Sequence, residues 1–485
     1  MMQLDTRKIL LVHPLGYSAE SAGSDISRMA NIMPPLGLAS IAAYLEREHF
    51  SADIIDCYAH PDSDAKISTY LQAQRPAWIG FSCTTSSFLD AVRLAMLAKS
   101  ILPEIRSVFG GAHVSALKGQ LLNDYPAVDI AVIGEGEETL RELMAKGFDQ
   151  AATVAGLVWR NAAGGAESNG YRSEALELDS LPFPAYEKLA GYPEAYTLPL
   201  FNYPKAPSTS CISSRGCPYA CTYCDRSVFQ RTFRHNSAAY LFRHVKYLHE
   251  RFGIRHINFY DDQFTFKRQR VEEFCQLMID NPLGMTFNCA VRAEHIDFEL
   301  LKLMKAAGCW MVSLGIESGD EELLARHRQN ANLDMLADKI RLIKKAGIRT
   351  KGLLMMGLPG ETEESIRRSM NYVFSLPIDD FNLSKFTPFP GSPIYEKIHE
   401  LGDFDEDWEK MDCMRFQFVP HGMQKDRLEE LFILFYKNHF QRPKVLLGYV
   451  AMMWKSPDSW KRFLANLGAF LRFAKSNDRL GEGKS

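Results

Sequence analysis

The stretch RGCPYACTYC, residues 215–224, places three of the chain's ten cysteines within eight residues. They are Cys217, Cys221 and Cys224. Three thiolates this close in sequence can converge on one metal centre. A closed zinc site takes four ligands, and so does an electron-transfer [4Fe–4S] cluster. Two interpretations follow: Cys211 or His235 completes a structural zinc site, or a cubane cluster keeps one iron open for a substrate.

The composition agrees with cysteines that bind a metal rather than form disulfides. The chain has 485 residues with 46% hydrophobic and 24% charged residues, which is typical of a globular protein of two to four domains. Ten cysteines exclude a disulfide-stapled scaffold, and a net charge of −3 predicts no nucleic-acid partner. No apolar leader opens the sequence, and the apolar run Val445–Trp454 is too short to span a bilayer. We expect a cytoplasmic protein with reduced cysteines.

Downstream of the cysteines, short strands alternate with helices. Together with a strand before the cysteine loop, they predict six βα units, a partial (β/α)6 barrel over residues 206–400 with its site at the carboxyl ends of the strands. Polar residues follow several predicted strands: Asp261, Asp262, Arg292, Glu317 and Ser318. A cap or a surface turn is the alternative explanation for each. Glu361 is expected to act only as a charge at a helix N-terminus.

Residues 1–150 show the same alternation and predict a doubly wound, Rossmann-like parallel sheet. Small or polar residues end its predicted strands: His13, Thr84, Gly110, Gly111, Gly134, Glu135 and Gly136. Glycines there let a backbone approach a large flat ligand, although tight βα turns also need them. Residues 151–205 are expected to form a linker with a hairpin, and residues 401–485 a basic, mostly helical region.

CxxxCxxC with Tyr223 before the last cysteine resembles the signature of the radical S-adenosylmethionine (SAM) superfamily. The resemblance implies a [4Fe–4S] cluster on the three cysteines. The acidic pair DD, the segment GIESG and the arginine between them lie where the family contacts SAM. It therefore implies a SAM site made of Tyr223, Asp261, Asp262, Arg292, Glu317 and Ser318.

The whole-chain layout is similar to cobalamin (B12)-binding radical SAM proteins. The segments PPLGLASIAAYLE, FGGAHVSA, GEGEETL and LPFPAYE carry this likeness, which includes anaerobic Mg-protoporphyrin ester cyclases and many C-methyltransferases. It implies cobalamin bound by the strand-end residues of the first domain, from His13 to Gly136. The DxHxxG motif is absent, because Leu11 stands where the aspartate would precede His13. Cobalt would therefore lack a histidine ligand.

The resemblance implies an enzyme that cleaves SAM to a 5′-deoxyadenosyl radical, which abstracts hydrogen from an unactivated carbon. Cobalamin-dependent methyl transfer to a small-molecule or lipid-like substrate would follow, with an external one-electron donor. A cyclase-like or other radical oxidation or rearrangement without methyl transfer is the alternative, and a non-catalytic cobalamin or metal sensor belongs to another class. A methylthiotransferase is disfavoured, because only Cys57 and Cys83 precede the linker to hold a second cluster.

The C-terminal tail is basic. Residues 425–485 hold twelve Lys and Arg against six Asp and Glu. Apolar residues recur there on one helical face: Trp460, Phe463, Leu464, Leu467, Phe470, Leu471 and Ala474. Such a helix either packs on its own barrel or makes peripheral contact with the inner membrane surface.

Overall fold

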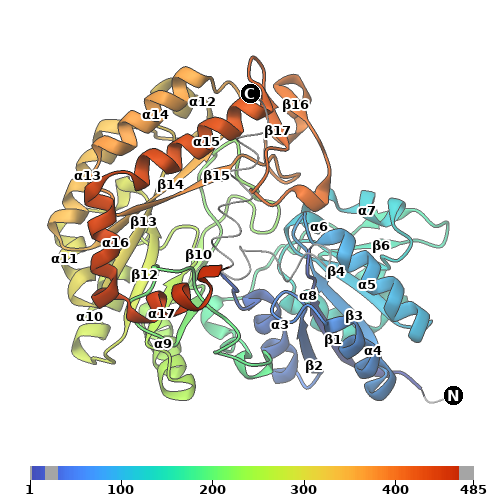
Figure 1. The fold of residues 1–485 in the computed structure, drawn as a ribbon. Helices are drawn as coiled ribbons and strands as arrows, with labels where there is room; N and C mark the ends of the chain where they lie inside the picture. The colour runs from blue at the N-terminus through green and yellow to red at the C-terminus, as the bar shows by residue number, and fades with distance from the viewer. Residues whose placement is uncertain (1–2, 17–30, 469–485) are drawn as a thin grey trace.

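The computed structural model describes residues 3–16 and 31–468, which form two lobes joined by a linker (Figure 1). The N-terminal lobe is built on a seven-stranded sheet of order β2-β1-β3-β4-β5-β6-β7. Its strands are β1 (Asp5–His13), β2 (Ser51–Asp56), β3 (Pro76–Ser82), β4 (Arg106–Gly110), β5 (Ile130–Val132), β6 (Leu157–Arg160) and β7 (Ala166–Ser168). The first five run parallel, as the alternation of strands and helices predicts, and β6 and β7 add an antiparallel edge.

Helices cover both faces of this sheet. They are α3 (Leu36–Arg47), α4 (Ser63–Gln74), α5 (Phe88–Ile101), α6 (Ala112–Leu117), α7 (Gly119–Asp124) and α8 (Glu137–Lys146). Helices α3 and α8 pack together on one face, and α4 and α5 on the other. Because the sheet is covered on both sides, β1 carries four consecutive buried apolar residues, Ile9 to Val12. The doubly wound prediction is confirmed.

The strand order places the ligand crevice of the N-terminal lobe. Strand β1 lies between β2 and β3, so the chain moves to opposite sides of β1 in its two crossovers. In such sheets ligands bind outside the carboxyl ends of the strands where the order reverses. Those ends face the second lobe (Figure 1).

The second lobe is a curled sheet of order β15-β14-β13-β12-β11-β8 in which all neighbours are parallel. Its strands are β8 (Ser208–Cys211), β11 (His256–Phe259), β12 (Thr286–Val291), β13 (Cys309–Glu317), β14 (Arg349–Met356) and β15 (Asp380–Lys385). Its outer helices are α9 (Ala238–Phe252), α10 (Arg268–Asp280), α11 (Phe298–Ala306), α12 (Glu321–His327), α13 (Leu333–Lys345) and α14 (Glu363–Ser375). The partial (β/α)6 barrel is confirmed; α12 was not predicted.

The linker is more than a crossover. It contains the short 3₁₀ turns η1 (Phe148–Thr153), η2 (Leu178–Ser180) and η3 (Tyr186–Lys188). Tyr186 is fully buried, and its hydroxyl lies 3.2 Å from His244 Nε2 of α9. The linker thus packs a side chain of its own against the barrel helix α9.

The C-terminal region returns to both lobes. A hairpin of β16 (Gly402–Phe404) and β17 (Phe418–Pro420) is preceded by η5 (Tyr395–Glu400) and carries η6 (Trp408–Lys410) between its strands. The Trp408 ring meets His113 of the N-terminal lobe edge-on, with 4.5 Å between ring centres. Helices α15 (Lys425–Phe440), α16 (Pro443–Lys455) and α17 (Pro457–Ala465) then run over the barrel (Figure 1). None of the helices within the described ranges is long and apolar enough to cross a membrane.

Candidate active site between the two lobes

The cysteine loop begins and ends in a small antiparallel ladder. Strand β9 (Ser214–Arg215) pairs with β10 (Arg234–His235), which closes the loop at its base. The Ala220 N–H donates to Gln329 Oε1 at 3.0 Å, and the Thr222 N–H to the His327 carbonyl at 3.0 Å. These bonds tie the loop to the segment after β13.

The thiols of Cys221 and Cys224 interact with one another. This hydrogen bond lowers the pKa of Cys221 to about 5, against the opposing effect of burial. Cys217 is half-buried, and burial raises the pKa of its thiol. The same hydrogen bond raises the pKa of Cys224, so the two thiols share one proton-binding site and lie close together in the loop.

The two residues predicted as a fourth zinc ligand, Cys211 and His235, each contact another group. Cys211 is fully buried at the end of β8, with Sγ 3.6 Å from His244 Nδ1. His235 Nδ1 lies 3.0 Å from the Asn236 carbonyl oxygen. Among the described residues no group of three or more His, Cys, Asp or Glu is arranged to hold a single metal ion.

Arg292 lies beside the cysteine loop. Its guanidinium stacks over the Tyr219 ring, 3.8 Å from the ring centre. Its Nη2 donates to the Gln329 carbonyl at 2.7 Å and to Glu294 Oε1 at 2.9 Å. The positive charge favours the thiolate forms of Cys217 and Cys221. Arg292 is thus fixed in place and brings a cation to the loop, as a SAM carboxylate would require.

Glu317 ends β13 in a strained conformation. Its φ of 63° is in the left-handed region, and its side chain folds back so that a Cβ on Gly315 would lie 2.5 Å from Oε1. Burial raises the pKa of Glu317 to about 7, with Arg328 opposing the shift. Strain of this kind collects at functional sites. Burial and the nearby Glu317 charge raise the pKa of Tyr223, so these two predicted site residues lie close to each other.

Asp261 and Ser318 are occupied by structural bonds. The Asp261 carboxylate is 3% exposed and accepts the Ser214 N–H at 3.1 Å. It also accepts the N–H and hydroxyl of Ser213, which contacts Arg270. Ser318 Oγ lies 2.9 Å from Ser369 Oγ. These bonds indicate that Asp261 supports the segment that enters the cysteine loop rather than contacting SAM. Its neighbour Asp262 instead lines a cavity between the two lobes.

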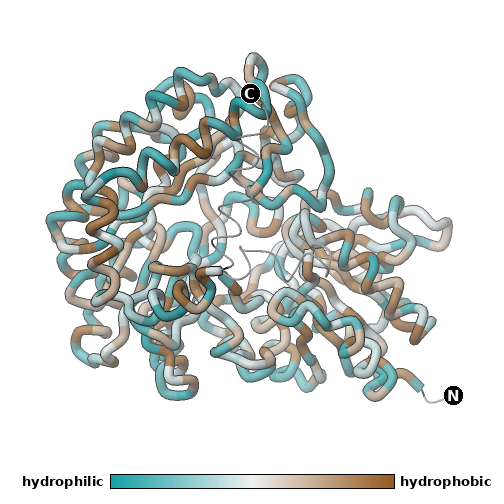
Figure 2. Tube along the Cα trace, viewed as in Figure 1, coloured by the Kyte–Doolittle hydropathy of each residue, from teal (hydrophilic) through white to brown (hydrophobic). Residues whose placement is uncertain are grey.

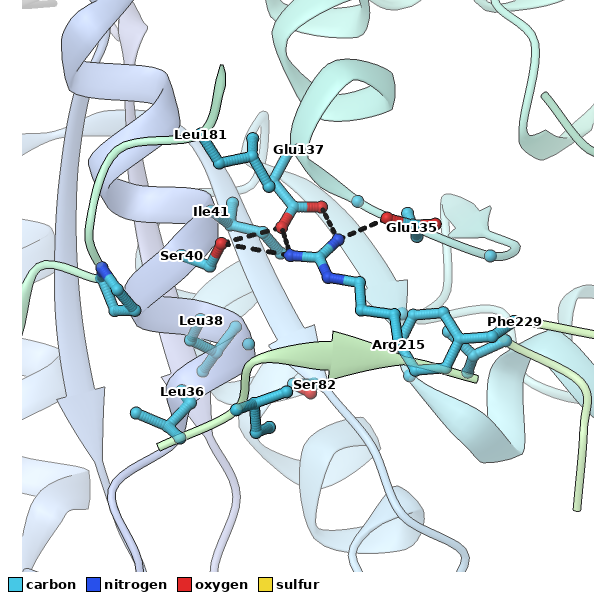
Figure 3. A pocket seen from close by; sticks show the side chains of 18 of the residues that line it. Leu36, Leu38, Ser40, Ile41, Ser82, Glu135, Glu137, Leu181, Arg215 and Phe229 are labelled. Atoms are coloured by element: carbon cyan, nitrogen blue, oxygen red, sulfur yellow. Dashed lines mark hydrogen bonds and ion pairs between the residues drawn. The ribbon is translucent and has the colours of Figure 1, made fainter. Parts of the chain in front are cut away.

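That cavity has a volume of about 360 Å³. One wall is the glycine edge of the N-terminal lobe, and the other comprises Asp262 with Arg215 and Phe229 of the cysteine loop. Figure 3 shows Arg215 and Phe229 together with Ser40, Ile41 and Glu137 of the N-terminal lobe. The predicted residues that line it are Gly110, Gly111, Gly134, Glu135, Gly136 and Asp262. Gly111 has a φ of 101°, and a Cβ there would meet the Cys83 carbonyl oxygen at 2.6 Å. A side chain at this position would disrupt the strand edge.

Two of the predicted cobalamin residues lie outside this lining. His13 Nδ1 is 2.8 Å from Asp56 Oδ1, which joins the ends of β1 and β2. Burial lowers the pKa of His13, but the Asp56 charge and hydrogen bond outweigh it and leave the pKa raised. Thr84 is exposed, and its hydroxyl donates to Ser87 Oγ at 3.0 Å.

An ion-pair network crosses the cavity between the lobes (Figure 3). Arg215, two residues before Cys217, donates from Nη2 to Glu137 Oε1 at 2.6 Å. Ser40 of α3 donates to the same oxygen at 2.8 Å. Glu135 accepts from Arg215 and from Arg234 of β10. The GEGEE loop of one lobe is thereby tied to both ends of the cysteine loop in the other.

Sequence reasoning missed several of these residues. Arg215 and Glu137 stood in quoted motifs, RGC and GEGEE, but opposite charges in separate domains do not reveal their pairing. Ser40 and Ile41 of α3 line the cavity, as do Leu181 and Pro182 of the linker. The sequence feature that could have pointed to these residues is their apolar or proline-rich surroundings. The same pattern is expected of residues that pack against each other without a ligand.

The interpretation of Glu361 was wrong. Thr362, not Glu361, caps α14, and the Glu361 side chain turns inward to accept the Gly357 N–H. Glu361 is 1% exposed, and burial raises its pKa to about 8. It closes the GLPGE turn after β14 from within, a role that a helix-terminal charge does not perform.

Comparison with known proteins agrees with this geometry. Residues 211–373 match the Radical SAM superfamily, and residues 25–144 match the B12 binding domain. The chain therefore contains a Radical SAM domain and a B12 binding domain. It is 29% identical to an uncharacterized methyltransferase of Pyrococcus horikoshii over 448 residues, 91% of this chain and 94% of the relative. It is 26% identical to the anaerobic magnesium-protoporphyrin IX monomethyl ester cyclase of Rubrivivax gelatinosus over 96% of this chain and 82% of the relative.

The fold has a solved counterpart. The radical SAM methyltransferase TsrM from Kitasatospora setae, solved with cobalamin and a [4Fe–4S] cluster bound, superposes with a TM-score of 0.65. The match covers 81% of this chain and 75% of that one at 19% identity. This radical SAM enzyme thus uses a [4Fe–4S] cluster, SAM and cobalamin, and needs an external electron donor.

The residues present fit these groups. The cysteine loop offers three thiols, and the glycine-edged cavity beside it has room for a flat ligand against the N-terminal sheet. Cys217, Cys221 and Cys224 would hold the cluster. Gly110, Gly111, Gly134 and Gly136 would lie against the corrin.

Proposed function

We propose that this enzyme catalyses cobalamin-dependent methyl transfer to an unactivated carbon of a small-molecule or lipid-like substrate. The observation that carries the proposal is the shared cavity. Its walls are the glycine edge of the B12-binding lobe and, opposite, Asp262 with Arg215 and Phe229, which flank the three cysteines, so a ligand held in this cavity would lie beside the cysteine loop. When bound, the cluster and SAM supply a 5′-deoxyadenosyl radical, and cobalamin supplies the methyl group.

The chain's own residues bind, orient and exclude water. Arg292, fixed beside the cysteine loop, would bind the SAM carboxylate, and Asp262 would bind its amino group. Glu317 and Tyr223 would contact the ribose or methionine part. Leu36, Leu38, Ile41, Leu181 and Pro182 give the cavity apolar walls that keep water from the reacting carbon. These walls also fit a substrate with a large apolar part. A lipid-like substrate would be met at a membrane, so the proposal includes peripheral contact through the C-terminal region.

The test separates methyl transfer from cyclase-like chemistry. Protein purified without oxygen is loaded with iron, sulfide and hydroxocobalamin, then incubated with a strong reductant and SAM carrying a trideuterated methyl group. We expect 5′-deoxyadenosine together with trideuterated methylcobalamin, detected by mass spectrometry. Formation of 5′-deoxyadenosine with no label on cobalamin overturns methyl transfer and favours a radical oxidation or rearrangement, as in the cyclase-like alternative.

Two substitutions of Gly37 test whether cobalamin occupies the cavity. It lines the cavity from α3, and a Cβ there would have no neighbour within 4 Å. Gly37→Trp should fill the cavity and abolish cobalt binding while the protein keeps about 4 Fe per chain. Gly37→Ala should retain both metals. Full cobalt binding by the tryptophan variant would show that cobalamin does not occupy this cavity.

A further inference from the structure

The tail helix that the sequence singles out is already partly packed. Trp460 and Phe463 of α17 lie against Phe201 of the linker, with ring centres 5.6 and 6.2 Å apart. The Phe201 N–H donates to Ser459 Oγ at 3.1 Å. The predicted stripe continues through Phe470, Leu471 and Ala474, which lie outside the described residues. The described part of this stripe is therefore mainly a packing face.

The preceding helix, α16, presents a different face. Only Val445 and Met452 of its apolar residues are buried, seven positions apart on the inward side. Leu447 is 69% exposed and Trp454 is 76% exposed. With them stand three further exposed apolar residues: Leu446, Val450 and Met453. Their spacing forms one helical stripe, and α16 is coloured mainly as hydrophobic in Figure 2.

This α16 face continues onto the end of α15. Phe440 is exposed, and its ring centre is 5.7 Å from that of Tyr449 on α16. Ile433, seven residues earlier on α15, is exposed as well. Single exposed apolar residues are ordinary on a protein surface, but a contiguous group of this size marks an interaction site.

The edge of the α16 face carries positive charge. Residues 437–468 contain six Lys and Arg and one Asp. Lys437, Lys444 and Lys455 are exposed, and no carboxylate of the described residues lies within ion-pair distance of them. Apolar residues flanked by unpaired cations are the pattern of a helix that lies in an anionic bilayer interface.

Charge also distinguishes between the partners that could cover the α16 face. A second copy of this chain would bring the same cations to the contact. The chain's own residues 469–485 hold four Lys and Arg against two Asp and Glu, so they too are basic. An anionic lipid surface is the occupant whose charge complements the edge of the α16 face.

We propose that the α16 face, Leu446, Leu447, Val450, Met453 and Trp454 with Phe440, docks on anionic lipid bilayers. The inference deepens the proposed membrane contact and assigns it to α16 rather than α17. It does not depend on the reaction, because vesicle binding needs neither cofactors nor substrate. Failure of vesicle binding would leave methyl transfer untouched, and failure of methyl transfer would leave the docking face untouched.

The experiment uses the full chain and liposome co-sedimentation. Vesicles of phosphatidylglycerol and phosphatidylcholine should bind the protein at low ionic strength, and vesicles of phosphatidylcholine alone should bind it far less. Binding should weaken at 1 M salt, where screening acts within about 3 Å. No binding to anionic vesicles at low salt overturns the proposal, and so does equal binding to both vesicle types.

Variants distinguish the face from general surface properties. Leu447→Ser with Trp454→Ser should lower the partition coefficient by at least about tenfold. The matched control is Met96→Ser with Met414→Ser, which removes two exposed apolar side chains elsewhere and should bind like wild type. Lys444→Gln with Lys455→Gln should cost about thirtyfold, since each cation contributes roughly fivefold. Lys397→Gln with Lys425→Gln is the matched charge control.

All of these side chains are exposed, so thermal stability should stay unchanged. Equal losses in the test and control pairs overturn the assignment to α16. A wild-type chain that is dimeric by sedimentation velocity, and whose dimer the Leu447→Ser/Trp454→Ser pair breaks, would make a second copy the occupant and would also overturn it.

Discussion

Replacing Arg215 by alanine should destabilise the protein strongly at neutral pH. Arg215 is 16% exposed and its partner Glu137 only 5%, at 2.6 Å. Removing one member of a buried pair costs about 3–5 kcal/mol, because the other charge stays buried without compensation. Burial raises the pKa of Glu137, but the Arg215 charge and hydrogen bonds outweigh it and hold the pKa below its usual range.

The sign of the pH dependence follows from this. In the wild type the pair stabilises the fold above the ordinary carboxyl pKa of about 4.3, and this contribution is lost as pH falls through the lower folded value. In Arg215→Ala the largest effect on Glu137 is burial, which only the Ser40 hydroxyl and a backbone N–H still oppose, so its pKa should rise above the unfolded value. The deficit of the variant should then be largest near pH 7 and should shrink toward pH 5.

Urea unfolding of the cofactor-free chain at both pH values measures the effect. The control is Arg341→Ala, which breaks an ion pair with Asp338 whose partners are 61% and 73% exposed; such a pair contributes less than about 1 kcal/mol. Arg215→Ala/Glu137→Gln should recover part of the loss by removing the stranded charge. If Arg215→Ala costs no more than Arg341→Ala, or its deficit grows as pH falls, the pairing of Arg215 with Glu137 is wrong.

Three other outcomes are expected. Changing Cys217, Cys221 and Cys224 to alanine should remove the cluster's iron, whereas Cys275→Ala should keep about 4 Fe per chain by iron analysis; stoichiometric zinc in wild-type protein purified without oxygen would contradict the cluster. Asp262→Ala should weaken SAM binding in equilibrium dialysis with stability intact, while Asp261→Ala should lower the melting temperature; equal SAM affinity of Asp262→Ala and wild type refutes that contact. Burial raises the folded pKa of Glu361 to about 8, above its unfolded value, so Glu361 stabilises the fold least at high pH. In thermal melts, Glu361→Gln should therefore gain stability relative to wild type as pH rises from about 5 to 8. A difference that stays constant over this range would count against a protonated Glu361.

Patterns along the chain were sufficient for the two lobes. The strands and helices of the barrel are long and periodic, so β11 to β15 and their helices could be predicted within a few residues. Helix α4 was missed because only Ser63, Ile67 and Leu71 of its twelve residues are buried, which leaves little periodic signal. The three cysteines could be identified because their spacing is local and their chemistry is specific.

The site itself depended on which side chains meet in space. Asp261 and Asp262 are adjacent, yet one supports the segment before the cysteine loop and the other lines the cavity, a difference of direction that adjacency does not encode.

The pairing of Arg215 with Glu137 joins residues 78 positions apart in different lobes. The choice of α16 over α17 as the exposed face rests on Phe201, a linker residue more than 250 positions before α17. Local sequence determined the elements and the metal-binding loop, because these depend on neighbours in the chain. Only the tertiary structure decided which polar groups are satisfied within the protein and which are left for a ligand or a membrane, because burial and pairing depend on contacts between distant segments.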